Sequence, residues 1–153
     1  MKTFLSVDRR LLNPQAIENV ELKVAVPTKD TKNNPLFIQD MPWEIRIDNG
    51  YPNVIYDSRE QIFHCYYTLF IEDKDTEGTT LQERTQRNYR PRMDRVISLA
   101  YARSKDGIHW EKPSLGLVDW RGSKKNNLLF RYAHGTGVML DEQDKDAGRR
   151  FKM

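Results

Sequence analysis

The sequence has a single cysteine, Cys65, among its 153 residues, so no internal disulfide can form. Because Cys65 lies in an apolar run, we expect a buried, unreactive thiol. Long apolar runs are also missing, and no segment approaches the roughly 20 residues that a membrane-spanning helix needs. The apolar stretch within residues 1–10 is too short for a secretory signal and is interrupted by charges. These absences predict no disulfide scaffold and no membrane partner.

A large excess of charge of one sign is missing as well. The 25 basic and 22 acidic residues give a net charge of +3, and no dense basic stripe occurs, so nucleic acid is not an expected partner. There is no glycine-rich phosphate loop and no Cys/His metal-ligand spacing. His64, His109 and His134 are far apart in different contexts and predict no Ser-His-Asp constellation. We therefore expect no cofactor and no metal.

Helix signals are weak throughout, whereas strand signals are frequent and short. Residues 62–71 form a nearly continuous apolar and aromatic run, which is typical of a strand buried on both faces. Asp106-Gly107 predicts a short hairpin whose return begins over residues 108–111. The pattern predicts an all-β fold of antiparallel hairpins, and a sandwich, a barrel or a propeller can each produce it. Further strands are expected over residues 20–26, 43–47, 54–56, 96–104, 128–130, 138–140 and 149–153.

A polar insert over residues 72–95 separates two of these expected strands. It is dense in Glu, Asp, Thr, Gln and Arg and has almost no aliphatic residues. Long loops of this kind are uncommon and are often functional. Two interpretations stay open: a solvated excursion, or a rim loop from which Tyr89, Arg90 and Arg92 reach toward a site.

Three sequence segments carry a resemblance to a known group of proteins. Together they resemble bacterial glycosyl hydrolases of the arabinanase, levansucrase and invertase type, which include glycoside hydrolase families 32 and 43. The segments are residues 34–44 with Pro42-Trp43-Glu44, residues 48–57 followed by Tyr66-Tyr67-Thr68, and residues 102–113 continuing to Asn126-Asn127.

The resemblance implies a partial five-bladed β-propeller. Residues 1–47 would be lead-in strands, residues 48–127 a first blade containing the insert, and residues 128–153 the start of a second blade. A closed propeller needs about twice this length. The resemblance therefore implies an N-terminal fragment that is not catalytic alone, with the general acid beyond Met153. It also implies a periplasmic or extracellular setting, as in relatives.

Glycoside hydrolysis requires two carboxyl groups that flank the scissile bond. In the resembled enzymes the first of them comes from the start of the first blade, which implies Asp48 or Glu44 as catalytic residues. The alternatives are that Asp48 only caps the Asn49-Gly50 turn and that Glu44 is an exposed strand position between buried neighbours. A carbohydrate partner is implied, with Tyr51, Trp43, His134 and Asp141 as substrate-binding residues.

Three interpretations of the whole chain stay open. The first is an incomplete glycoside hydrolase. The second is a carbohydrate-binding or structural piece without catalytic carboxylates. The third is a homo-oligomer in which several chains complete one propeller, since open strand edges invite pairing with another chain.

Overall fold

The computed structural model describes residues 26–47, 50–88 and 94–153. The chain divides into two units, residues 1–30 and residues 31–153, and all helices and strands of the described part belong to the second unit. The strand expected over residues 20–26 lies almost entirely outside the described residues. No helix among the described residues is long and apolar enough to cross a membrane.

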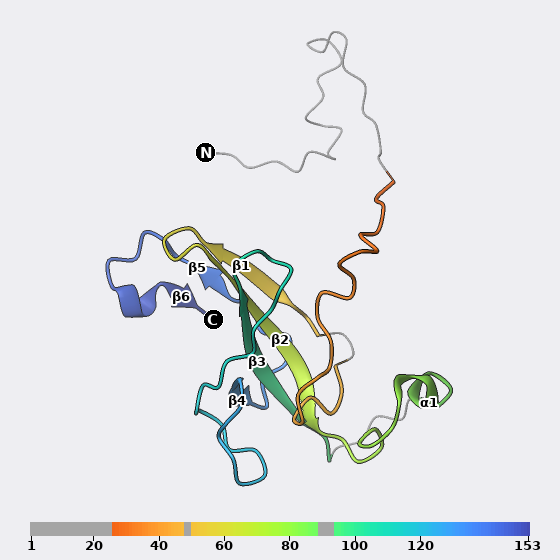
Figure 1. Cartoon of the computed structure of the whole chain (residues 1–153). Coiled ribbons are helices and arrows are strands. Elements are labelled where there is room, and N and C mark those ends of the chain that lie inside the picture. Colours follow the sequence, from red (N-terminus) through yellow and green to blue (C-terminus); the bar gives the residue numbers. More distant parts are fainter. Residues whose placement is uncertain (1–25, 48–49, 89–93) are drawn as a thin grey trace, which may run out of the picture. The chain divides into compact units, whose positions relative to one another are not determined.

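A four-stranded antiparallel sheet in the order β1-β2-β3-β4 dominates the second unit (Figure 1). Its strands are β1 (Asn53–Asp57), β2 (Ile62–Glu72), β3 (Val96–Ser104) and β4 (Leu128–Arg131). Each follows its predecessor as a neighbour, so the sheet is a meander. The four strands expected over residues 54–56, 62–71, 96–104 and 128–130 are confirmed.

The sheet is covered on both faces, which explains the composition of β2. One face carries a core built around Tyr67, Leu69 and Ile71, against which Trp43, Trp110 and Trp120 pack. The other face carries Tyr66, Leu99 and Val138, with Phe151 beside them. Alternate residues of a strand point to opposite faces. A strand that is central in a two-sided core therefore needs an unbroken apolar run, as the sequence predicted.

The C-terminal residues form a second, two-stranded sheet. It pairs β5 (Met139–Leu140) with β6 (Phe151–Lys152), joined by a turn that contains a short 3₁₀ segment over Ala147–Arg149. Both strands lie within the segments expected over residues 138–140 and 149–153, and both are shorter. β5 also contacts β1.

Two expected strands are wrong. Over residues 43–47 only Arg46 forms a bridge, to Phe70, and Glu44 and Arg46 are buried, whereas Trp43 and Ile45 are half-buried. The expected alternation is thus inverted, because Glu44 and Arg46 find charged partners inside. Over residues 108–111 only Glu111 bridges, to Arg103, so Asp106-Gly107 lies within a longer turn.

The polar insert contains a helix that the sequence analysis did not predict. Helix α1 (Leu81–Thr85) follows Thr80, whose side chain accepts a hydrogen bond from the backbone N–H of Glu83. The Glu83 carboxylate in turn accepts from the backbone N–H of Thr80, which completes a capping box. No residue of α1 is buried. The fold is all-β with antiparallel sheets, and the sheets formed by the described residues do not close into a barrel or ring.

Candidate functional site

Two of the residues predicted to bind substrate meet at the end of the sheet. Tyr51 precedes β1 and His134 follows β4, and their ring centroids lie 5.0 Å apart in an edge-on arrangement. Both side chains are exposed. Tyr51 has a φ of 40°, in the left-handed region that costs a residue other than glycine about 1–3 kcal/mol. The Tyr51 backbone is therefore strained where its exposed ring stands beside His134.

Hydrogen bonds between sequence-distant segments fix this end of the sheet. The Thr68 backbone N–H donates to the Gly50 carbonyl at 2.6 Å, and the Thr68 hydroxyl accepts from the Gly135 N–H at 3.3 Å. The Val138 N–H donates to the Asn53 side chain. Thr68 therefore ties the turn before β1 to the loop before β5, and the pairing of Tyr51 with His134 follows. Asp48, predicted as catalytic, lies outside the described residues.

Glu44, the other residue predicted as catalytic, lies in a buried hydrogen-bond network. Its carboxylate accepts from the Tyr67 hydroxyl at 2.7 Å and from the backbone N–H groups of Asp40 and Met41. The Lys112 ammonium lies 2.8 Å away, and the Glu44 side chain is 0% exposed. Burial and then the charge of Glu44 raise the pKa of Tyr67, so this phenol stays protonated and donates. The expected exposed position of Glu44 is corrected: its side chain points inward.

Trp43 and Asp141 are engaged elsewhere in the fold. The Trp43 indole donates to the Asn127 side chain at 2.7 Å, and its ring meets that of Trp120. Asp141 accepts from the Gln143 N–H at 3.1 Å in the turn after β5, and the Lys152 ammonium lies 3.6 Å from its carboxylate. Trp43 and Asp141 thus contact other residues than Tyr51 and His134, so the structure does not gather all the predicted residues in one place.

A cavity of about 1230 Å³ opens on the sheet face that carries Tyr67. Its lining includes the apolar or aromatic residues Phe37, Val54, Cys65 and Trp110, and also Arg46 and Arg84 among other arginines. Arg46 lies 2.9 Å from the buried Asp73 carboxylate, and its guanidinium stacks over Phe70. The cavity lining therefore combines apolar and basic side chains.

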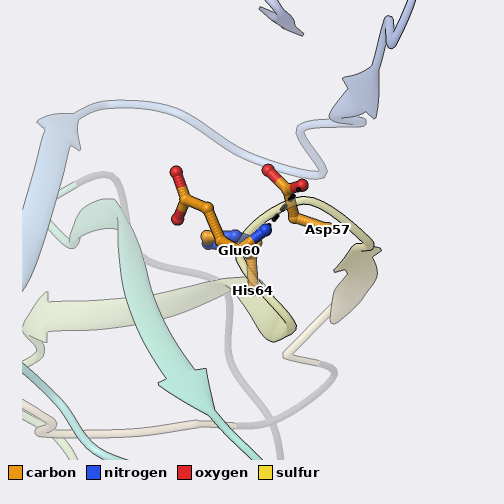
Figure 2. A group of neighbouring side chains, drawn as sticks. All are labelled: Asp57, Glu60 and His64. Atoms are coloured by element: carbon orange, nitrogen blue, oxygen red, sulfur yellow. Dashed lines mark hydrogen bonds between the residues drawn. The ribbon is translucent and has the colours of Figure 1, made fainter.

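A second polar cluster was missed by the sequence analysis. Asp57, Glu60 and His64 come together around the β1–β2 turn (Figure 2), with one ligand-type atom from each within 4.8 Å of the others. The Arg150 guanidinium lies 2.8 Å from the Asp57 carboxylate. The group has no Cys/His ligand spacing: Asp57 and Glu60 are three residues apart, and Glu60 and His64 are four residues apart, on a hairpin. Strand pairing, which aligns Ile55 with His64, is the signal that would have found it.

Opposing influences set the ionisation of this cluster. Burial by itself would raise the pKa of Asp57, but hydrogen bonds from Arg150 and from the backbone N–H groups of Arg59 and Glu60 outweigh it and hold that pKa below its ordinary value. Burial lowers the pKa of His64, against the raising effect of the Glu60 and Asp57 charges. Asp57 is therefore ionised and His64 neutral near pH 7.

Comparison with known proteins finds no matching family model, no similar curated sequence and no similar solved structure. The functional inference therefore rests on the residues themselves and on their arrangement.

Proposed function

We propose that this chain is part of a carbohydrate-active β-propeller of the glycoside hydrolase 32/43 type, and that it binds an oligosaccharide where Tyr51 and His134 meet. The observation that carries the proposal is the order of the strands. A propeller blade is a four-stranded antiparallel sheet, and successive blades stand side by side around an axis. The meander β1-β2-β3-β4 has the strand order of one blade, which moves β4 (Leu128–Arg131) from the start of the second blade, where the sequence analysis assigned it, to the end of the first. β5, the next strand along the chain, contacts β1.

The proposed site has the chemistry that sugars require. A sugar ring presents apolar C–H faces that stack on aromatic rings, and its hydroxyls need hydrogen-bond partners. Tyr51 is 46% exposed and supplies the ring, and the exposed His134 imidazole beside it supplies a donor and an acceptor. Asp48, three residues before Tyr51 in the sequence, lies outside the described residues, and its role as a catalytic carboxylate stays a prediction.

We further propose that the chain alone binds sugar without hydrolysing it. Two carboxyl groups must reach the glycosidic bond for hydrolysis. Glu44 is buried and hydrogen-bonded to Tyr67 and Lys112, so its carboxylate is not free to protonate a leaving group. Sugar binding therefore depends on Tyr51 and His134, whereas hydrolysis would also need a general acid.

Titration calorimetry with fructose-, arabinose- and xylose-containing oligosaccharides tests this proposal. We expect one of these classes to bind, with affinity lowered at least about tenfold in Tyr51→Ala, since truncating an aromatic residue that anchors an interface costs about 2 kcal/mol or more. The matched control is Tyr56→Ala, which removes a tyrosine that is 48% exposed near the other end of β1. Reducing-sugar release, assayed in parallel, should stay at background. Equal affinity of Tyr51→Ala and wild type, or no binding by any class, contradicts the proposal.

A further inference from the structure

The β1–β2 turn brings an oxygen from each of two carboxylates and an imidazole nitrogen within 4.8 Å of one another, at the opposite end of β1 from Tyr51. Asp57 is the last residue of β1, Glu60 lies in the turn, and His64 lies in β2. His64 pairs with Ile55, two residues before Asp57, so His64 and Asp57 point to the same face of the sheet. The group therefore forms within one hairpin, because the register of β1 and β2 and the length of the turn between them bring the three side chains together.

An independent observation points to a ligand at this place. His64 is only 7% exposed, and its Nε2 atom is buried with no hydrogen-bond partner, whereas its Nδ1 atom lies 2.7 Å from the Tyr101 hydroxyl. A buried polar atom left without a partner costs about 1–3 kcal/mol. One ring nitrogen fixed by a hydrogen bond while the other faces a ligand is the arrangement that metal-binding histidines adopt.

The neighbouring charges leave the group attractive to a cation. Asp57 accepts from Arg150 and from two backbone N–H groups, and a carboxylate has about four acceptor positions, so one remains for a metal. The Arg150 guanidinium balances the negative charge of Asp57 but not that of the exposed Glu60. Arg103, whose charge also reaches His64, is itself paired with Glu111 at 3.0 Å.

We propose that Asp57, Glu60 and His64 form a Zn²⁺ site, with water as the fourth ligand. One imidazole nitrogen with carboxylate oxygens is a donor set that zinc accepts. Ligand atoms around a tetrahedral zinc with bonds of about 2.0–2.1 Å stand about 3.4 Å apart. Binding therefore draws the ligands closer than the present limit of 4.8 Å, and Glu60, exposed on the turn, is the one that moves. Three protein ligands and a water complete the tetrahedron, and the water is the ligand that another molecule could replace.

The test is a calorimetric titration of the tag-free, chelator-treated chain with ZnCl₂, with CaCl₂ as a second probe. We expect one Zn²⁺ per chain, and at least tenfold weaker binding by Glu60→Gln, an exposed change that leaves the fold intact. The matched control is Glu142→Gln, which removes another exposed carboxylate, one bonded to Ser58 beside the same turn. It should change the affinity less than threefold.

Substitution of the buried ligand tests the imidazole. His64→Asn should abolish the binding, whereas His109→Asn, on an exposed turn where His109 pairs with Asp106, should not. Replacement of zinc by Co²⁺ should give the visible absorption of a four-coordinate ion in wild type and in Glu142→Gln, and a much weaker band in Glu60→Gln. Calcium binding without zinc binding, equal loss in Glu60→Gln and Glu142→Gln, or no saturable site at one equivalent overturns the proposal.

Discussion

At the scale of single residues, Glu44 shows how a charged side chain becomes part of a core. Its partners Tyr67 and Lys112 are 23 and 68 residues away in the sequence. Lys112 is also bonded to Asp40 and to the Ile38 carbonyl, and it stacks over Phe37. The network therefore holds residues 37–44 against the sheet. Local alternation cannot reveal such partners, which is why the sequence left only two interpretations of Glu44, a catalytic carboxylate or an exposed strand position.

Glu44→Gln should destabilise the fold strongly. The change leaves the buried Lys112 ammonium with less negative charge and places an amide N–H₂ group among donors. Removal of one partner of a buried ion pair costs about 3–5 kcal/mol, and we expect about 3 kcal/mol because Asp40 still faces Lys112. Urea unfolding followed by tryptophan fluorescence measures this. Glu111→Gln breaks the exposed pair with Arg103 and should cost at most about 1 kcal/mol. Equal midpoints for the two variants would contradict the structural role of Glu44.

Cys65 should be unreactive in the folded protein, as the sequence predicted from its apolar surroundings. Burial raises the pKa of its thiol from 9.0 to about 11, so at pH 8 about one molecule in a thousand carries a thiolate, against about one in ten when unfolded. Alkylation of the thiol at pH 8, measured by mass spectrometry, should be about 100-fold slower without urea than with it. Ser114→Cys, at an exposed position, should be modified quickly at its added thiol in both conditions. Rapid loss of the Cys65 thiol in the folded chain would show an open core.

The same thiol makes a contribution to the pH dependence of stability. Its folded pKa is raised, so the contribution is fully present below pH 9 and is lost as the pH rises through about 11. Tyr66, whose pKa burial raises to about 12, acts in the same direction at higher pH. Wild type should therefore lose more stability between pH 8 and pH 10.5 than Cys65→Ser does. Parallel loss in both proteins would mean that other groups control alkaline unfolding.

At the scale of elements, composition predicted the strands of the four-stranded sheet. Hydrogen-bond partners determined the structure of the other segments. β2 and β3 were predictable because their apolar runs are buried on both faces. Residues 43–47 and 108–111 each form only one bridge, since hydrogen bonds with distant or turn residues replace strand pairing there. The meeting of Tyr51 with His134 could not be located from sequence spacing. It depends on Thr68, which lies in neither segment and bonds to both.

Helix α1 had a readable signal, Thr80 followed three residues later by Glu83, in a segment where polar composition suggested only a loop. Thr80→Ala should loosen this helix by about 1 kcal/mol. The change should speed proteolysis within residues 76–88, and the urea midpoint of the whole protein should not move, because α1 buries no residue. Thr85→Ala, in the last turn of the same helix, should not speed cleavage. A shift in the global midpoint with Thr80→Ala would mean that the insert packs on the sheet.

At the scale of the whole molecule, the four-stranded sheet has two open edges within the described part of the chain. β1 pairs only with β2, β4 pairs only with β3, and Val54 and Phe130 on these strands are each 50% exposed. Unpaired backbone groups with apolar side chains favour pairing with another sheet. This is the physical basis of the interpretation in which several chains complete one propeller.

Light scattering after size exclusion, over a range of concentrations, tests that interpretation. We expect a discrete oligomer of the wild-type chain that Val54→Lys converts to a monomer, because a charge on an edge strand opposes edge pairing. Leu117→Lys, at a side chain that is 58% exposed and outside the strands, should leave the oligomer unchanged. If the oligomer forms, the sugar titration belongs to the assembled protein, because β1, beside Tyr51, would lie at a subunit interface. A monomer at every concentration would contradict this interpretation. Sugar and zinc binding would then both be properties of a single chain.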